Sequence, residues 1–563
     1  MDRLNQGKEE TFVYSDMMKF LAITACLFLS CAATAQENLI YHTIRTDNNG
    51  HIVPWYKDDP GESYDHIIDL VWNFWDTMRL DLNSLPYYMN HQVWKPGYND
   101  ARGLGGDQLQ MALSSWQLLY AYTGNERVKQ NMKFIADYYL THSLSPANCK
   151  WPNLPFPYNT LIYSGIYDGD MVIGPGYLQP DKAGSLGLEL VHLYKMSSRD
   201  FYLQSTSGRY LDAAIKIATT LIAHMQPGDE DHSPLPFKVN AYTGQTGSLK
   251  NNNIDGTIVG KAGYTTNWCS TMELFLSLQQ LDKSRAAAYK AAFNVLLSWM
   301  KKYPLKNCRW GPFFEDVQGW SDTQINATTF AWFMMEHRQY FPDWQRQVQA
   351  IFDWTYKTLG NRNWEKYGVT VVNEQTVYQT PGESHTSRQG ATELLYCALS
   401  GDTARKMNAI RQLTWATYMV DVDGKNRFPQ DEPWLTDGYG DYVRHYLRAM
   451  AAYPELAPSS ADHILSSTSV IQQADYKGQA NKFLVPYVNV DDVSKVMFYY
   501  RAFDSAGIEM VRMKVRPARV LLTSKPLKEV SDEKQEGYRW IPLAKGGVLR
   551  IHRLRGIEVA VLE

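Results

Sequence analysis

The feature that most constrains the fold of this chain is an alternation between short and long connections along a series of amphipathic segments. Apolar residues recur at i, i+3, i+4 and i+7 in twelve segments, a spacing typical of helices with one buried face. The segments are 64–80, 106–123, 126–142, 181–196, 209–226, 267–282, 285–303, 326–338, 343–359, 387–399, 403–420 and 437–453. Connections after the second, sixth, eighth and tenth segments are only a few residues long, and the one after the fourth is somewhat longer, which favours antiparallel neighbours.

The connections after the odd-numbered segments are long, and strict alternation places all of them on one face. They are 81–105, 143–180, 227–266, 304–325, 360–386 and 421–436. A tandem solenoid would keep a fixed repeat length, whereas these hairpins vary in length. The pattern therefore predicts a mainly α fold, a closed ring of six helical hairpins known as an (α/α)6 toroid. Long connections in a compact domain are usually functional, and each leads into a helix N-terminus, which favours anionic groups.

The periodicity changes from helical to β-type near Leu465. Short β-type runs separated by turns follow at 483–488, 495–500, 507–515, 519–523, 547–551 and 556–562. About 100 residues of this kind predict an all-β sandwich domain. The expected organisation is a leader and signal peptide at 1–35, a catalytic toroid at 36–460 and a C-terminal β-sandwich at 461–563.

The N-terminal region has the pattern of a secretory signal peptide. Met17, Met18 and Lys19 precede the apolar stretch 21–29, and the small-x-small sequence 33–35 stands just before Gln36. The apolar stretch is shorter than the roughly 20 residues that span a bilayer. We therefore expect synthesis to start at Met17 or Met18, cleavage after position 35, and a periplasmic or secreted protein.

The charge and cysteine content exclude several classes of partner. With 56 basic and 59 acidic side chains the net charge is −3, no basic run suggests nucleic acid, and no later apolar stretch could cross a membrane. The cysteines outside the leader are Cys149, Cys269, Cys308 and Cys397, without the CxxC spacing of a zinc site. We expect no metal and no cofactor, while one or two disulfides are permitted in an exported protein.

The aromatic content points to a carbohydrate partner. The chain has 17 Trp and 37 Tyr, and 13% of its residues are aromatic. Buried rings account for part of this content, and rings lining a groove would pack against the C–H faces of sugars. Export signal, twelve alternating helices, aromatic-rich connections and a C-terminal β-domain together resemble the six-hairpin glycosidases and toroid polysaccharide lyases of Bacteroidetes-type glycan degraders. That group also includes unsaturated glucuronyl hydrolases, other uronic-acid glycosidases and sugar epimerases, so the resemblance does not choose the reaction.

The long connections carry the candidate site residues. Aromatic and polar candidates for substrate binding are Trp94, Asn99, Arg102, Tyr167, Trp320, Asn326, Arg388 and Trp434. Candidates for catalysis are Asp322, Glu383, His385, Asp437 and Tyr439. Asp322 could instead be a helix N-cap, and Asp441 with Arg444 could form a structural i, i+3 ion pair. The acidic segment 229–232 and the segment 421–426, which lacks the distal Glu of a calcium loop, are interpreted as turns.

Two chemistries fit these residues. Glycoside hydrolysis needs a proton-donating carboxylic acid and a second carboxylate, and Glu383, Asp437 and Asp322 come from three connections on one face. Glu374 or Asp100 could replace any of them. Arginines at 388 and 102 could bind a substrate carboxylate bidentately, which favours a substrate that contains uronic acid.

The alternatives use other residues or no chemistry at all. A lyase that acts by β-elimination must neutralise the uronate carboxylate, remove the C5 proton and protonate the leaving oxygen. Asn326, His385, Arg388 and Tyr439 supply the residue types for those steps. We rank hydrolase before lyase, and a C5- or C2-epimerase third. A non-catalytic glycan-binding protein would instead present a flat face without convergent acids.

Overall fold

The computed structural model describes residues 38–39, 41–89, 106–161, 164–170, 172–198, 204–250, 258–314, 320–426, 439–477, 495–532 and 534–563. The predicted leader and signal peptide at 1–35 lie outside these residues. In the described part of the chain, no helix combines the length and apolar character needed to cross a membrane.

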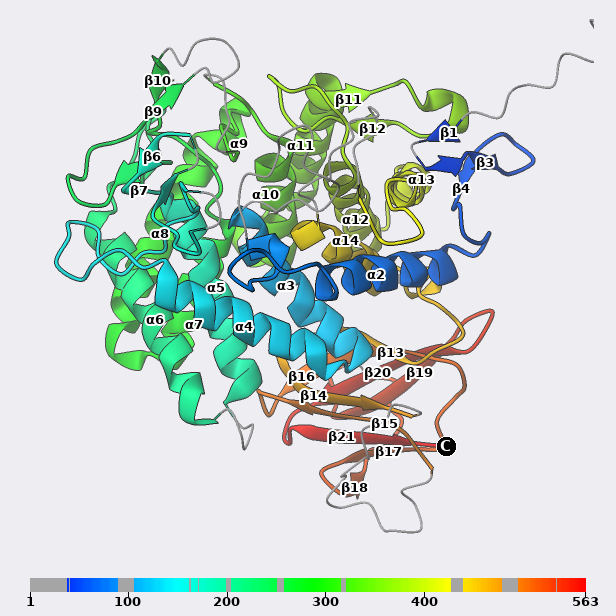
Figure 1. Ribbon diagram of the computed structural model, residues 1–563. Coiled ribbons are helices and arrows are strands. Elements are labelled where there is room, and N and C mark those ends of the chain that lie inside the picture. Colours follow the sequence, from blue (N-terminus) through cyan, green and yellow to red (C-terminus); the bar gives the residue numbers. More distant parts are fainter. Residues whose placement is uncertain are drawn as a thin grey trace, which may run out of the picture.

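The twelve predicted helices are all found (Figure 1). They are α2 (Pro60–Asp76), α3 (Gly106–Thr123), α4 (Glu126–His142), α5 (Pro180–Ser197), α6 (Gln204–His224), α7 (Cys269–Leu281), α8 (Ala286–Lys302), α10 (Gln324–Glu336), α11 (Trp344–Leu359), α12 (Glu383–Ser400), α13 (Lys406–Thr417) and α14 (Tyr439–Ala452). A further short helix, α9 (Pro304–Asn307), follows α8.

Local sequence explains where several of these helices begin and end. The Asp59 side chain accepts hydrogen bonds from the backbone N–H groups of Gly61 and Glu62, so it caps α2. Asn125 caps α4 in the same way. Gly401 ends α12 with φ +78°, a left-handed conformation that glycine adopts at little cost.

The helices pack as two concentric layers. Helices α3, α5, α7, α10, α12 and α14 contact one another in that order, and α14 returns to contact α3. Helices α4, α6, α8, α11, α13 and α2 pack against the outside of this inner ring. At the seam between α14 and α3, the Ser115 hydroxyl donates to the Gly440 carbonyl over 2.8 Å. The contact between first and last inner helices closes the ring, which a tandem solenoid would leave open.

Large aromatic side chains fill the space between the layers. Six tryptophans are almost completely buried: Trp75, Trp116, Trp268, Trp299, Trp310 and Trp415. Trp116 of α3 packs edge-on against Trp75 of α2, with ring centroids 5.4 Å apart. Part of the aromatic content of the sequence is therefore structural. The inner helices α5 and α7 approach each other closely where Gly184 faces Thr271, since a Cβ at Gly184 would lie 2.0 Å from the threonine hydroxyl.

The C-terminal part of the chain forms two antiparallel sheets that share one hydrophobic core. One sheet has the order β13 (His463–Ser467), β16 (Gly507–Met513), β20 (Gly547–Arg553) and β19 (Gly537–Pro542). The other has the order β14 (Ile471–Tyr476), β15 (Val496–Ala502), β21 (Glu558–Leu562), β17 (Arg519–Leu522) and β18 (Lys525–Pro526). The boundary at 460/461 stays a prediction; the first strand of this part begins at His463.

The β-sheets pack against the ends of inner helices (Figure 1). His463 stacks on Tyr122 at the end of α3, with ring centroids 3.8 Å apart. Gln472 of β14 donates to the carbonyl of Lys195 at the end of α5 over 2.6 Å. Both contacts lie at helix C-termini, so the sheets cover the face of the ring opposite the long connections.

The long connections on the other face contain short strand pairs. These are β5 (Gly169–Asp170) with β6 (Gly174–Pro175), β7 (Tyr177–Leu178) with β8 (Val239–Asn240), β9 (Ser248–Lys250) with β10 (Ile258–Lys261), and β11 (Gly360–Asn361) with β12 (Val371–Val372). Near the N-terminus, β1 (Asn38–Leu39) pairs with β2 (His42–Thr43), and β3 (Arg45–Thr46) pairs with β4 (Ile52–Val53). The second and third long connections are joined through the β7–β8 pair.

Two segments interpreted as turns are turns in the structure. In the acidic segment, the exposed Asp229 accepts from the backbone N–H groups of Asp231 and His232. In the other, the backbone N–H of Asp421 donates to the carbonyl of Lys425 over 2.8 Å. Within the described residues, no group of three or more His, Cys, Asp or Glu side chains could hold a metal ion. The four cysteines of this part of the chain are free.

Candidate functional site

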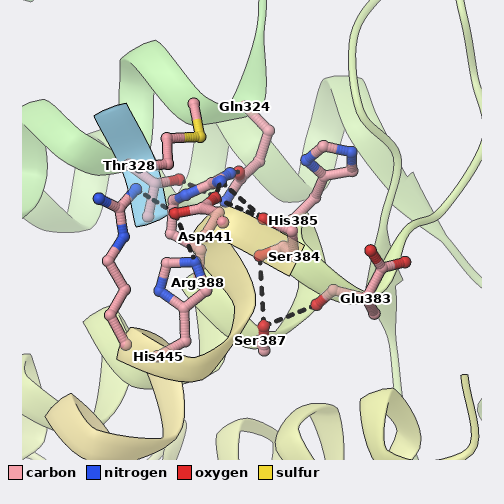
Figure 2. Close-up of polar contacts among 12 residues, drawn as sticks. Gln324, Thr328, Glu383, Ser384, His385, Ser387, Arg388, Asp441 and His445 are labelled. Atoms are coloured by element: carbon pink, nitrogen blue, oxygen red, sulfur yellow. Dashed lines mark hydrogen bonds and ion pairs between the residues drawn. The ribbon is translucent and has the colours of Figure 1, made fainter. Parts of the chain in front are cut away.

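The first turns of α12 and α14 bring the densest group of polar side chains together at the mouth of the ring (Figure 2). Glu383 is the first residue of α12, after the extended backbone of Gly382. The figure labels Glu383, Ser384, His385, Ser387, Arg388, Gln324, Thr328, Asp441 and His445. Three inner helices, α10, α12 and α14, therefore contribute to one polar cluster.

Arg388 and Asp441 form the buried centre of this cluster. The guanidinium of Arg388 donates from Nη1 to Gln324 Oε1 over 2.8 Å and from Nη2 to Ser384 Oγ over 2.9 Å. It also pairs through Nη2 with Asp441 Oδ2. Asp441 pairs through Oδ1 with Arg444, as the i, i+3 spacing had suggested. Both η nitrogens of Arg388 are thus occupied, which corrects its interpretation as a residue free to grip a substrate carboxylate bidentately.

The arginines create a positive electrostatic field around the cluster. Burial, together with the nearby Arg444 and Arg448, lowers the pKa of Arg388. Burial lowers the pKa of His445 well below its usual value, and the same three arginines lower it further. His445 therefore stays neutral near pH 7.

Glu383 reaches from α12 toward the sixth long connection. Its side chain is 1% exposed, and Oε1 accepts a hydrogen bond from Asn426 Nδ2 over 3.0 Å. Asn426 closes the turn that follows α13. The carboxyl group of Glu383 is consequently held at the entrance of the ring by a residue 43 positions later in the chain.

His385 and Glu374 form a second pair beside it. His385 Nε2 lies 3.5 Å from Glu374 Oε2, and Glu374 Oε1 accepts from Gln375 Nε2 over 3.1 Å. The imidazole of His385 also meets the edge of Phe314, with ring centroids 6.1 Å apart. Its buried Nδ1 has no hydrogen-bond partner among the described residues. A carboxylate–imidazole pair with one free ring nitrogen has the composition of a proton-transfer site.

Asp322 and Asn326 hold the fourth connection in place. Asp322 Oδ1 accepts from the backbone N–H groups of Trp310 and Gly311 over 2.7 and 2.9 Å. Asn326 Nδ2 donates to the carbonyl of Trp310 over 3.0 Å. The N-cap position of α10 is Thr323, so Asp322 is not the cap of that helix. These contacts give Asp322 and Asn326 roles in shaping the loop.

Two aromatic candidates have different environments. Tyr167 is 2% exposed, and its hydroxyl donates to the carbonyl of Met89 over 2.8 Å, which ties the second connection to the first. A buried ring offers no face to a sugar, so the interpretation of Tyr167 as a substrate-binding residue is corrected. Trp320 is 38% exposed, and the guanidinium of Arg309 lies 4.5 Å from its ring centroid. The remaining candidates Trp94, Asn99, Arg102, Trp434 and Asp437, and the side chain of Tyr439, lie outside the described residues.

Sequence analysis did not single out a cavity of about 100 Å³ inside the inner ring. All six inner helices supply side chains to it, including Gln110 of α3, Lys182 and Glu189 of α5, and Arg448 of α14. At its rim, Asn267 Nδ2 donates to Asp181 Oδ2 over 2.9 Å, and burial raises the pKa of Asp181. The sequence does contain a signal of this cavity. Charged residues such as Arg444 and Arg448, four positions apart, lie on helix faces that otherwise carry apolar residues.

No protein-family profile matches the sequence, and no curated protein matches it. Among solved structures, a sugar epimerase from a ruminal bacterium is similar with a TM-score of 0.50 and 12% identity, covering 69% of this chain and 98% of the epimerase. A family 76 glycoside hydrolase from a bovine Bacteroides thetaiotaomicron strain has a TM-score of 0.42 and 11% identity, covering 70% and 79% of the two chains. A polysaccharide lyase has a TM-score of 0.38 and 10% identity, covering 69% and 96%. At 12% identity, the likeness to the epimerase concerns the fold alone.

Proposed function

We propose that this chain is an exported carbohydrate-active enzyme, an (α/α)6 toroid with a C-terminal β-sandwich, that hydrolyses glycosidic bonds in a glycan containing uronic acid. The observation that carries the proposal is that two carboxyl groups, Glu374 and Glu383, both act electrostatically on the buried Arg388, and that Glu374 also pairs with His385. They lie on the face of the long connections, opposite the β-sheets. The sugar epimerase of similar fold supports a carbohydrate as the substrate class.

Glu383 is the proposed general acid. Its Oε1 is held by Asn426, which fixes the orientation of the carboxyl group toward the connections that lead into α12 and α14. Protonation of the glycosidic oxygen by Glu383 would release the leaving sugar, and a carboxylate on the other side of the bond would activate water or attack the sugar directly. Glu374 is the described candidate for that second carboxylate, and Asp437 remains the alternative from the sixth connection.

The uronic-acid preference rests on charge. Lys182, Arg388, Arg444 and Arg448 line the cavity beneath the polar cluster, and Glu189 is the carboxylate that lines it with them. A neutral sugar would gain little from this concentration of cations, whereas a sugar carboxylate would form charge-assisted hydrogen bonds with it.

A second candidate is proton abstraction from carbon, as in a lyase or an epimerase. The specific observation is the pairing of His385 with Glu374 while Nδ1 of the imidazole stays without a partner among the described residues. The carboxylate would stabilise the imidazolium that forms when Nδ1 removes a proton next to a sugar carboxylate.

The discriminating experiment is digestion of a panel of uronic-acid polysaccharides, and of oligosaccharides cut from them, with the wild-type protein and its Glu383→Gln, His385→Ala and Glu365→Gln variants. Reducing sugar and the ultraviolet absorbance of a C4=C5 double bond are both followed. Hydrolysis predicts new reducing ends at constant absorbance, with loss of activity in Glu383→Gln and retention in Glu365→Gln, a matched change on an exposed side chain. Falling absorbance on unsaturated oligosaccharides would indicate an unsaturated-uronyl hydrolase.

The same panel tests the second candidate. Rising absorbance that depends on His385 and survives Glu383→Gln would replace hydrolysis by elimination. Exchange of a sugar proton for deuterium in heavy water, without chain cleavage, would indicate an epimerase. Absence of all three signals on every substrate would refute a catalytic role on uronic-acid glycans.

A further inference from the structure

The cavity inside the inner ring holds more cationic than anionic groups. Lys182, Arg388, Arg444 and Arg448 line it, and Glu189 is the acidic residue among its lining side chains. Asp441 neutralises part of this charge, but it is 1% exposed and is already shared between Arg388 and Arg444. Cations buried together repel one another unless an anion accompanies them.

The neighbouring acids offset this charge only in part. Glu374 and Glu383 favour the charged form of Arg388 but do not line the cavity. Glu336 lies near Arg448, but burial raises the pKa of its carboxyl group and so favours its neutral form. At the rim, burial has the same effect on Asp181. Burial and the neighbouring Arg444 lower the pKa of Arg448 to about 10, which still leaves its guanidinium charged near pH 7.

Several hydrogen-bond donors around the cavity lack an acceptor. Nε of Arg388, Nε of Arg444 and Nε2 of Gln110 are buried and have no hydrogen-bond partner among the described residues. Arg444 is 14% exposed at its side chain and Arg388 5%, so bulk water does not replace that partner freely. A buried donor without an acceptor costs about 1–3 kcal/mol in proteins, and more when it is charged.

We propose that this cavity is a binding site for a small anion, either a free halide or the carboxylate of a uronic acid. The site would use Arg388, Arg444 and Gln110 as donors and Arg448 and Lys182 as charge. A water molecule needs about 10–15 Å³, so a cavity of about 100 Å³ accommodates an anion together with waters. The carboxylate as occupant rests on the proposed function, whereas the halide as occupant rests on the cavity alone.

The test is thermal unfolding of the whole chain with sodium bromide, sodium glucuronate or glucose, at constant ionic strength kept with sodium HEPES. An anion at about 100 times its Kd should raise the Tm by about 2 °C, and glucose should not. Arg448→Met should abolish the rise, whereas Arg346→Met, the same change at a side chain that is 78% exposed, should keep it. Lys182→Met provides a second variant of the cavity should Arg448→Met fail to fold.

Crystals grown in bromide give a direct measurement on the unmodified protein. An anomalous peak beside Arg444 and Arg448 would support a free halide as the occupant. A rise in Tm with glucuronate but not with bromide would support a uronic-acid carboxylate as the occupant of the cavity. No rise with either anion and no anomalous peak would overturn the proposal, as would a rise that persists in both cavity variants.

Discussion

Replacing Asp441 by alanine should destabilise the protein by several kcal/mol, whatever its reaction. Its carboxylate is 1% exposed and pairs with Arg388 through one oxygen and with Arg444 through the other. Ser384 also donates to it from the first turn of α12. Removing one partner from a buried ion pair costs about 3–5 kcal/mol, since the remaining charge stays buried without compensation.

The size of the expected Tm change follows from the length of the chain. Unfolding entropy is about 2.1 cal/mol/K per residue, and with 563 residues this loss corresponds to a fall in Tm of about 3–4 °C. Differential scanning calorimetry of Asp441→Ala measures it. Asp343→Ala removes an exposed ion pair with Arg346, whose side chains are 66% and 78% exposed, and should change Tm by about 1 °C or less.

A second substitution at Asp441 separates the effect of its charge from the effect of its shape. Asp441→Asn keeps the size of the side chain and one acceptor for Ser384 while removing the charge. The Tm of Asp441→Asn should lie between those of the wild type and of Asp441→Ala. A Tm for Asp441→Ala equal to that of Asp343→Ala would refute the reasoning that Arg388 and Arg444 depend on this carboxylate.

Three further predictions concern activity, pH and packing. Glu383→Gln should lower kcat on the cleaved glycan about 10²–10⁴-fold with Tm unchanged within about 2 °C, and a fully active variant would remove Glu383 from catalysis. Burial raises the pKa of Glu393 to about 7, so wild-type stability falls as pH rises from the unfolded value of 4.5 through 7. The stability of Glu393→Gln relative to that of the wild type should therefore increase by about 3 kcal/mol from pH 4 to pH 8. Tm measured for both proteins across this pH range tests this, and parallel pH profiles would contradict it. Gly184→Ala should cost about 1–3 kcal/mol because its Cβ would meet Thr271, and Thr271→Ala in the same chain should restore most of the loss of Tm. No restoration would place the strain elsewhere.

Sequence periodicity was sufficient for the helical part because the apolar stripe and the local stop signals agree. Segments 106–123 and 126–142 were predicted with the bounds that α3 and α4 have in the structure. Between them, Gly124 takes a positive φ of 66° and Asn125 caps the next helix, so both signals were local. The predicted start of α12 was four residues late because the first turn of this helix is polar. That turn carries candidate site residues, and neighbouring helices bury it.

Glu383 and His385, at the first turn of α12, lie on the long-connection face, but the contacts of the candidate residues depend on partners distant in sequence. The partner of Arg388 is Asp441, 53 positions later, and no local pattern distinguishes an arginine that binds substrate from one that pairs internally. Asp322 likewise binds the backbone of Trp310 and Gly311 in a loop whose path only the folded chain defines. The spacing of apolar residues also predicts apolar faces on the inner helices toward the inside of the ring, so it does not predict the cationic cavity.

Closure of the ring has a consequence for biogenesis. Ser115 and Gly440, which bond across the seam between α3 and α14, are 325 residues apart. At a synthesis rate of about 5–20 residues per second, the inner face of α3 waits about 16–65 s for the helix that completes its burial. Throughout that interval an apolar surface is exposed on the nascent chain. The yield of such a chain should therefore be more sensitive to the depletion of chaperones that hold unfolded proteins than its stability would suggest.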